Sequence, residues 1–418
     1  MKMRGRALTL WTRVLAVAVV PATAFAGVQA YSAEDEALFL KRVAEISMIV
    51  GRGLEAYDPL ERVAGAPFVS LPHAREQSIA PTALSTATHY AAERKSSALI
   101  IWRGGKIEAE QYFNGFDAAK PIVSKSLAKP VTALLIGRAI KLGYIKSLDQ
   151  PVADFISEWK GDASREKMKI RHLLDMRSGL LMQGQPTGPQ DILNRAYLHP
   201  RHDEIIIREY PLINEPGARY DYSNATSELI APVIERATGM RYGPFLSEAL
   251  LKPIGAAGGM IWLNRPGGMA HSGCCLMLPA QSWLRIAVLL MQDGAWNGKR
   301  LLPDGYTAAM RTPTAENPHY GMGVWVAGPY VERRGFAHPS IPIGKVLHSE
   351  SYAARDLTLF DGNSNQVVYI IPSRNLIILR TGETPPKTLE WDNAFLPNLI
   401  IRGSIRRPSD RILEPQAR

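Results

Sequence analysis

The order of strand-like and helix-like segments most constrains what this chain can fold into. Extended apolar runs lie near both ends of the chain, around the pair Gly104-Gly105 and again at 356–360, 366–371 and 375–380. Between about residues 130 and 260 the apolar residues instead recur at helical spacing. One sheet made from both ends of the chain, with an all-helical region inserted between them, satisfies that order. We therefore predict an α/β (α+β) fold and not a doubly wound one.

The chain has 418 residues, which is long enough to bury a large core. Its 46% hydrophobic and 21% charged residues are typical of a globular protein and exclude a disordered one. The predicted division is a signal peptide at 1–26, an N-terminal helix and connector at 27–80, a main domain at 81–400 with its helical insertion at about 130–260, and a basic tail at 401–418.

The first 26 residues have the three parts of a secretory signal. A basic start is followed by the apolar run Val14 to Phe25, and Ala24 and Ala26 suit cleavage before Gly27; a second possible site precedes Tyr31. The apolar run is shorter than the roughly 20 residues of a membrane span. We expect a periplasmic or secreted protein with no stable membrane span after cleavage; an uncleaved anchor is the alternative.

The net charge of +10 suggests nucleic acid at first sight. Part of it belongs to the leader, which is basic and carries no acid, and part to the tail, with Arg402, Arg406 and Arg407. Basic residues nowhere alternate with aromatic ones along a helix, as nucleic-acid binding would favour. We expect no nucleic-acid partner.

The two cysteines, Cys274 and Cys275, are adjacent and cannot build a disulfide framework. A bond between neighbours would need an unusual ring geometry, so we expect two small buried residues that activity does not require. The chain has no HExxH or C-x-x-C pattern, and we expect neither a metal nor a cofactor. His271, His338 and His348 are possible site residues, although a lone histidine is more often structural.

Three Ser-x-x-Lys motifs begin at Ser126, Ser157 and Ser164. The last two lie in polar stretches typical of a solvated surface. Ser126 lies where an extended region gives way to an apolar helix, whose first turn has unpaired N–H groups and positive potential. Lys129 falls on the same helical face, and an amine removed from water favours the neutral form that can act as a base. The alternative is a helix-capping serine beside a surface lysine.

A second pattern, Tyr222-Ser-Asn224, leads into a predicted helix. Alternate residues of an extended loop lie on one side, so Tyr222 and Asn224 can face the same site. A tyrosine can pass a proton to a leaving group, and an asparagine amide can bind a carbonyl and a lysine at once. The alternative is that Asn224 caps the helix and Tyr222 packs behind it. A decoy of the same form is Tyr112-Phe-Asn114.

With these motifs the chain resembles the serine β-lactamase-related family, which covers class C β-lactamases, D-Ala-D-Ala carboxypeptidases, related esterases and nylon-oligomer (6-aminohexanoate-dimer) hydrolases. The resemblance runs from about residue 80 to 400 and includes the linking stretches 170–180, 294–302 and 366–372. It implies a β-lactamase/transpeptidase-like fold with an antiparallel sheet flanked by helices. It also implies an acyl-enzyme on Ser126, proton transfer by Lys129 and Tyr222, and substrate binding by Asn224.

The family's third motif, Lys-Thr-Gly or His-x-Gly, is not preserved. By position it falls at Phe360-Asp361-Gly362, where no cation stands, and Arg380-Thr381-Gly382 ranks second. The N–H of Asn363, after Gly362, could complete an oxyanion hole with that of Ser126. Without the cation a substrate carboxylate loses its partner, which favours small neutral esters or amides. A penicillin-recognising enzyme, either β-lactamase or D,D-carboxypeptidase, remains the alternative, followed by a silent binding protein of the same fold.

Overall fold

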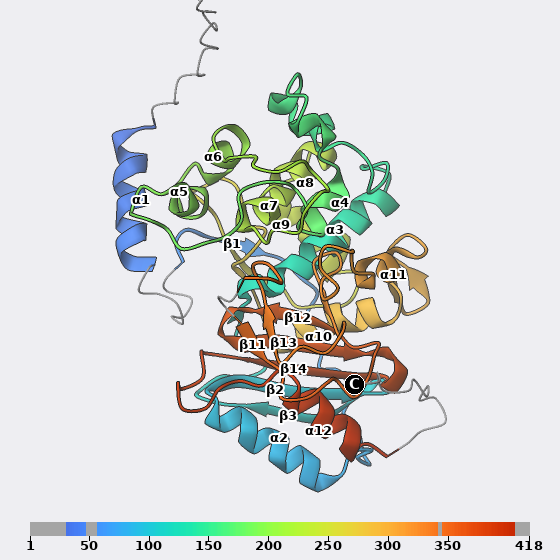
Figure 1. Ribbon diagram of the computed structural model, residues 1–418. Coiled ribbons are helices and arrows are strands. Elements are labelled where there is room, and N and C mark those ends of the chain that lie inside the picture. Colours follow the sequence, from blue (N-terminus) through green and yellow to red (C-terminus); the bar gives the residue numbers. More distant parts are fainter. Residues whose placement is uncertain (1–30, 47–56, 342–344, 406–418) are drawn as a thin grey trace, which may run out of the picture.

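The computed structural model describes residues 31–46, 57–341 and 345–405. Its centre is a six-stranded antiparallel sheet with the strand order β3-β2-β14-β13-β12-β9 (Figure 1). Two of these strands precede the helical region and four follow it, so the sheet is built from both ends of the chain as predicted. Their bounds are β2 (Ser96–Arg103), β3 (Lys106–Tyr112), β9 (Trp325–Val326), β12 (Thr358–Gly362), β13 (Gln366–Ile371) and β14 (Leu376–Gly382).

Tight turns join the neighbouring strands. The β2–β3 hairpin turns at Gly104 and Gly105, which both have positive φ, a conformation that costs glycine nothing. The β13–β14 hairpin turns through Pro372–Arg374 and Asn375, whose φ is 46°. Both hairpins were indicated by turn residues between apolar runs.

Helices cover both faces of this sheet. Along β2, Leu99 and Ile101 face the helices α2 (Pro81–Glu93) and α12 (Phe395–Gly403), while Ile100 and Trp102 face the core beneath α10 (Ala280–Met291). That alternation is the period of a strand buried on both faces. Helix α2 was not predicted because its buried face is mostly alanine, which gives a weak amphipathic pattern.

The helical layer lies above the sheet (Figure 1). It consists of α3 (Ala128–Lys141), α4 (Ile170–Leu174), α5 (Ile192–Leu198), α6 (His202–Arg208), α7 (Asn224–Glu228), α8 (Ile230–Thr238) and α9 (Tyr242–Leu246), the last continued by the π-helical turn Ser247–Leu251. The helix expected over 224–238 is divided at Leu229 into α7 and α8. A shorter helix, α11 (Tyr306–Arg311), follows α10.

A second, smaller sheet connects the two layers and was not predicted from sequence. Its order is β1-β5-β6-β4, with β1 (Leu60–Val63), β4 (Ile122–Val123), β5 (Gly259–Trp262) and β6 (Leu276–Leu278). These strands have two to four residues, too short to show an alternating pattern. Two further ribbons pair β7 (Ala295–Trp296) with β8 (Lys299–Arg300), and β10 (Arg333–Gly335) with β11 (Lys345–Leu347).

Helix α1 (Ala33–Ile46) packs on the helical layer at its outer side (Figure 1). Phe39 is fully buried there, and the buried guanidinium of Arg42 donates to the carbonyls of Leu198, Asn264 and Asp58. Phe39 shares a small hydrophobic cluster with Trp262 and the two cysteines. The N-terminal segment is therefore part of the folded body and not only a connector.

Cys274 and Cys275 form a disulfide bond with each other, which corrects the expectation of two free thiols. Both residues are buried, as expected, and the Tyr197 hydroxyl donates to Cys274 Sγ over 3.1 Å. Cys275 has a φ of 63°, a backbone conformation that few non-glycine residues adopt.

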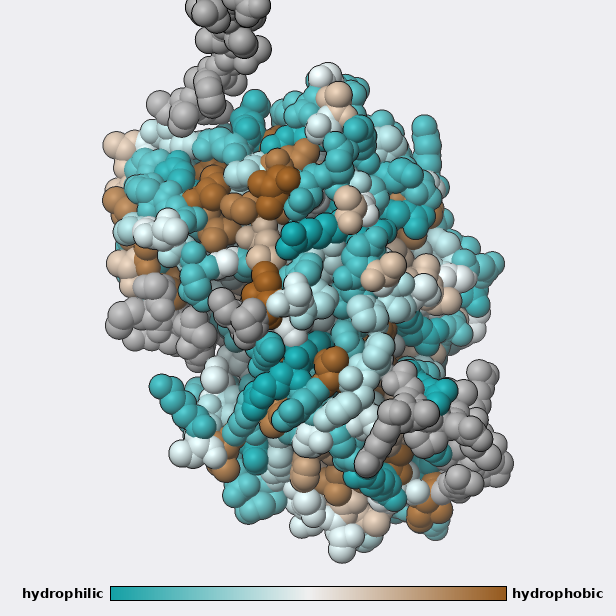
Figure 2. Space-filling view, in the orientation of Figure 1, coloured by the Kyte–Doolittle hydropathy of each residue, from teal (hydrophilic) through white to brown (hydrophobic). Residues whose placement is uncertain are grey.

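Hydrophilic side chains predominate on the face seen in Figure 2, with smaller hydrophobic patches mainly over the helical layer. Within the three described ranges, every helix is too short or too polar to cross a membrane. The predicted signal peptide and most of the basic tail lie outside the described residues.

Candidate active site

Ser126 lies in the turn that starts the central helix of the helical layer. Strand β4 ends at Val123, the 3-10 turn Lys125–Leu127 follows, and α3 continues it from Ala128. Pro130 is the third residue of α3, still within its first turn, where proline is tolerated. Ser126 is partly exposed. The serine therefore lies at a helix N-terminus with its hydroxyl accessible, as the motif predicted.

Lys129 lies one turn further on and is almost wholly buried. Its Nζ donates to Ser126 Oγ at 3.2 Å, to Asn224 Oδ1 at 3.0 Å and to the Gly273 carbonyl at 2.9 Å. Three acceptors match the three protons of an ammonium group. A neutral amine would keep the two shorter contacts and direct its lone pair at the serine, which is the geometry of a general base.

Tyr222 approaches the serine from the other side. Its hydroxyl donates to Ser126 Oγ at 2.9 Å, and its ring lies 4.9 Å from Lys129 Nζ. The ring is packed against Trp325, with centroids 6.5 Å apart, and against Phe336, 5.6 Å away. Aromatic contacts of this kind fix the ring, so the hydroxyl position is defined by packing as well as by the hydrogen bond.

Asn224 is the first residue of α7, two residues after Tyr222, as the spacing predicted. Its side-chain oxygen is committed to Lys129, which leaves the amide nitrogen as a donor at a partly exposed position. The backbone around Tyr222 is held by hydrogen bonds to Gln183 and Ala337 on either side. Ser126, Lys129, Tyr222 and Asn224 are thus brought together from two separate parts of the chain, 126–129 and 222–224.

Gly362 ends β12 directly beside the serine turn. A Cβ placed on it would lie 3.0 Å from the Ser124 carbonyl and 3.1 Å from the Leu127 N, so a side chain there would displace that turn. Asn363 follows at an exposed position, and its side-chain oxygen accepts from the N–H of Ser364. The strand end and the serine turn are therefore adjacent, as the predicted oxyanion site requires.

The two candidates for the third motif occupy different places. In the first, Asp361 pairs with the Arg334 guanidinium and accepts from the Asn393 amide. In the second, the buried Arg380 donates to five oxygens, among them the carbonyls of Ser364, Asn365 and Arg94. Burial lowers the pKa of Arg380 to about 9. The donors of Arg380 are therefore used in hydrogen bonds within the fold. Of the two candidate motifs, the one ending at Gly362 is the one next to Ser126.

The decoys lie apart from this cluster. Ser157 starts a 3-10 turn on the helical layer, and Ser164 precedes another such turn. The Tyr112 hydroxyl donates to Glu110, and the Asn114 amide donates to the Ser96 carbonyl. Of the three histidines singled out, His338 bonds to Ser340, His348 to Tyr352, and His271 is buried behind the site.

Gly273 is a site residue that the sequence analysis missed. Its carbonyl accepts from Lys129, and the disulfide of Cys274 and Cys275 follows it directly. A Cβ on Gly273 would lie 2.7 Å from Ser227 Cβ and 3.0 Å from Glu228 Oε1. Only glycine allows the segment to approach α7 this closely. The unusual Gly-Cys-Cys sequence was the one signal available, and it gave no indication of a lysine partner.

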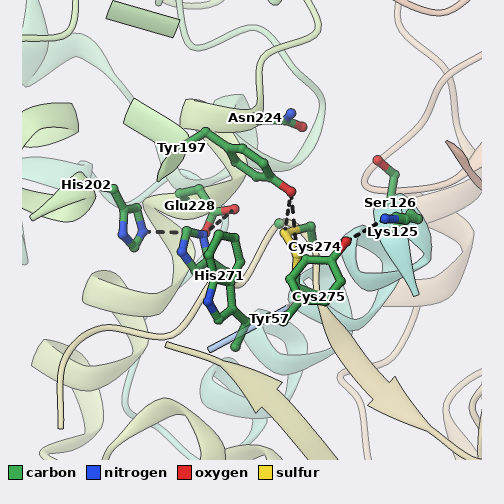
Figure 3. The surroundings of a disulfide bond; sticks show 12 residues. Tyr57, Lys125, Ser126, Tyr197, His202, Asn224, Glu228, His271, Cys274 and Cys275 are labelled. Carbon is green, nitrogen blue, oxygen red and sulfur yellow. Dashed lines mark hydrogen bonds and ion pairs between the residues drawn. A yellow bond between two sulfur atoms is a disulfide. The ribbon is translucent and has the colours of Figure 1, made fainter. Parts of the chain in front are cut away.

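A buried cluster of titratable side chains packs against Gly273; of its members, only His271 was singled out from the sequence. In Figure 3, His202, Glu228 and His271 lie on one side of the disulfide and Ser126 on the other. Among the described residues this is the one group of three histidine, cysteine or acidic side chains whose ligand atoms lie within 4.8 Å of one another. We call it the buried triad. Its members come from α6, α7 and the loop before β6, a proximity that spacing in sequence does not reveal.

Comparisons with known proteins bear on the family and the fold of the chain. The Beta-lactamase family model matches residues 85–274. A 6-aminohexanoate-dimer hydrolase of Paenarthrobacter ureafaciens is 23% identical over 229 residues, 52% of this chain and 57% of that enzyme. The alignment thus spans little more than half of the curated relative's length.

Solved structures share the fold across most of the chain. A putative 6-aminohexanoate-dimer hydrolase from Bacillus anthracis superposes with a TM-score of 0.63 at 19% identity, over 82% of this chain and 90% of that one. A putative β-lactamase from Bacteroides dorei gives 0.58 at 15% identity, over 77% and 97%. The predicted β-lactamase/transpeptidase-like fold class is confirmed.

Proposed function

Because the chain is related to the Beta-lactamase family over residues 85–274 and has that family's fold, we propose that it is a serine hydrolase of small esters or amides, acting through an acyl-enzyme on Ser126. The observation that carries the proposal is the convergence of Lys129 Nζ and the Tyr222 hydroxyl on one serine oxygen, at 3.2 and 2.9 Å. A nucleophile within reach of two proton-transfer groups is the usual signature of covalent acyl transfer.

The reaction begins with attack of Ser126 Oγ on the substrate carbonyl carbon, while Lys129 takes the serine proton. The negative charge that develops on the carbonyl oxygen faces the N–H of Ser126 and the N–H of Asn363, at the helix N-terminus and the strand end. Tyr222 then gives its proton to the leaving alcohol or amine. Lys129 returns its proton to the tyrosine. In the second half of the reaction water attacks the acyl group, the same two residues transfer its proton to Ser126 Oγ, and the acid is released.

The surroundings favour a neutral substrate. Asp361 stands where related enzymes carry the middle residue of a cationic motif, and the nearby Arg334 is already paired with it. Two opposite charges in contact leave little field to attract a substrate carboxylate. Beside Tyr222, the partly exposed ring of Phe336 offers apolar area instead. Asn224 supplies an amide N–H that can hold the carbonyl of an ester or amide.

The experiment is intact-protein mass spectrometry after exposure to p-nitrophenyl acetate, a short amide, a fluorophosphonate and a panel of penicillins. The proposal expects one acyl or phosphonyl adduct per chain, located on Ser126, with the esters reacting faster than the penicillins. Ser126→Ala must lose the adduct, whereas Ser157→Ala and Ser164→Ala must keep it. Preferential, long-lived acylation by penicillins would instead favour a penicillin-recognising enzyme. The absence of any adduct would refute the hydrolase.

The export of the protein is a separate proposal. Residues 1–26 have the order of a signal peptide, and the disulfide between Cys274 and Cys275 is a bond that persists in oxidising compartments outside the cytoplasm. Both observations favour the periplasm or secretion.

A further inference from the structure

The buried triad is a group of three polar side chains without hydrogen-bond partners. His202, Glu228 and His271 are each no more than 1% exposed. His202 Nε2 lies 3.7 Å from Glu228 Oε2, and His271 Nδ1 lies 3.8 Å from Glu228 Oε1, just beyond hydrogen-bond length. Their ring nitrogens and carboxylate oxygens find no other partner within the described residues. Buried groups of this kind are rare enough to require an explanation.

The charges within the triad can be assigned from burial. Burial by itself raises the pKa of the Glu228 carboxyl, but the two facing imidazoles outweigh it and hold that pKa below its usual range. Burial and the neighbouring His202 lower the pKa of His271 to about 4, so His271 is neutral. An isolated buried carboxylate is costly. A compensating proton held between this carboxylate and a facing imidazole makes the triad neutral as a unit.

A metal ion explains the triad less well. A metal lies in the ring plane of every histidine that binds it through nitrogen. The rings of His202 and His271 are instead stacked, with centroids 4.2 Å apart and planes 12° from parallel. Two nearly parallel planes do not meet close to the rings, so no single ion can lie in both. His271 also stacks on Trp262 at 3.9 Å and 12°. Turning either ring to bind a metal would break this column of rings.

The triad reaches the candidate active site through α7 and Gly273. Glu228 lies one helical turn after Asn224, and a Cβ on Gly273 would come within 3.0 Å of its carboxylate. Ser272 ties the two segments further, because its hydroxyl donates to the Ser227 carbonyl at 2.8 Å and accepts from the Ala231 N–H. Two acceptors of Lys129 are thus linked to Glu228: Asn224 lies on the same helix, and Gly273 packs against the Glu228 carboxylate.

We propose that His202 and Glu228 are positioning residues for Lys129: the proton on His202 cancels the charge of Glu228 behind Gly273, so that the lysine amine can be neutral and act as a base. The inference rests on the proposed hydrolase function. A bare carboxylate at this place would stabilise the ammonium form of Lys129 and remove the base.

Other charged groups around the triad do not titrate near neutral pH. Burial raises the pKa values of Tyr197 and Tyr242, which face it from α5 and α9, so both stay neutral. Arg42, above Trp262, has its pKa lowered to about 10 by burial and stays charged. The two cysteines are bonded to each other and carry no titrating proton. The protonation of the triad is therefore governed by its own members.

The first experiment reads the triad directly and does not depend on activity. Nitrogen-15 NMR of histidine-labelled protein at pH 7 should show one buried imidazole with both ring nitrogens protonated. That signal should be absent in His202→Asn. In Glu228→Gln the same imidazole should give the signals of the neutral form, with one ring nitrogen protonated. Elemental analysis of the purified protein accompanies it. A stoichiometric transition metal lost in His202→Asn, or neutral forms for all buried histidines of the wild type, would overturn the assignment.

The second experiment reads the coupling to Lys129, as the pH dependence of kcat/KM for p-nitrophenyl acetate. His202→Asn should raise the midpoint of the acidic limb by about one pH unit, which is about tenfold in rate on that limb. The double variant His202→Asn/Glu228→Gln should bring the midpoint back to that of the wild type, because the uncompensated charge is gone. If His202 and Glu228 had only a structural role, both variants would react more slowly, and the double variant would not recover the wild-type midpoint.

His199→Asn is the matched control. His199 is equally buried, lies three residues before His202, and contacts Glu36 at 3.4 Å and the Phe39 ring of α1. Its replacement should lower thermal stability without moving the midpoint. If the NMR assignment holds and His202→Asn leaves the midpoint unchanged, the coupling to Lys129 is refuted while the hydrolase stands. If Ser126 is never acylated, the hydrolase itself fails, and the positioning role fails with it.

Discussion

Gly273 is the position at which one added methyl group should damage the candidate site most. In Gly273→Ala the new Cβ would lie 2.7 Å from Ser227 Cβ, whereas ordinary contacts begin at 3.4 Å, so the segment must retreat from α7 by about 0.7 Å. If the Gly273 carbonyl moves by that amount away from Lys129, its 2.9 Å hydrogen bond becomes too long to hold the amine.

The expected costs can be separated into stability and rate. Overpacking of this size destabilises a folded protein by about 1–3 kcal/mol, measurable by urea unfolding. A misplacement approaching 1 Å in a catalytic group lowers the rate by up to about a hundredfold, so we expect a 10- to 100-fold loss in the acylation rate with p-nitrophenyl acetate. Gly188→Ala is the control, because a Cβ there meets nothing within 4 Å. Wild-type acylation by a destabilised Gly273→Ala would refute the argument that Gly273 places Lys129.

The other predictions concern the proton path, the disulfide and export. Tyr222→Phe should acylate almost normally with an activated ester, whose leaving group needs no proton, and at least a hundredfold more slowly with a matched amide; equal losses on both would remove Tyr222 from the path. Cys274→Ala/Cys275→Ala should lose about 1–3 kcal/mol of unfolding free energy but keep acylation within tenfold, and a hundredfold loss in the folded variant would contradict this. N-terminal sequencing of material from the periplasm or medium should begin at Gly27 or Tyr31, and an intact Met1 in the cytosol would rule out export.

The parts of the fold that were predicted from the sequence are those with a strong local signal. The hairpin around Gly104-Gly105 and the strands β13 and β14 combine turn residues with β-branched runs, which few other structures accommodate. Helix α2 and the four-stranded sheet were missed because alanine-rich or very short elements give almost no periodicity. Their existence depends on tertiary packing, which overrides local preference.

The residues of the candidate site also include some that were predicted from local sequence signals and some that were not. Ser126 and Lys129 lie one turn apart, and Tyr222 and Asn224 two residues apart, so each pair follows from helix or strand geometry. Gly273 reaches Lys129 through its backbone carbonyl, an atom that every residue type has, and therefore leaves no signature in the sequence. The bond between Cys274 and Cys275 was rejected on ordinary backbone geometry, but Cys275 adopts a positive φ.

Helix α1 has a consequence for how this protein can change over evolutionary time. It lies outside the residues matched by the family model, but Arg42 binds the carbonyls of Leu198 and Asn264 and covers Trp262, the outermost ring of the column that ends at His202. A lysine cannot reproduce that planar, multiply bonded contact. Relatives that keep the disulfide and the column of rings should therefore also keep α1 with Arg42. Relatives that have lost this helix should carry other residues at the positions of Trp262, His271 and His202.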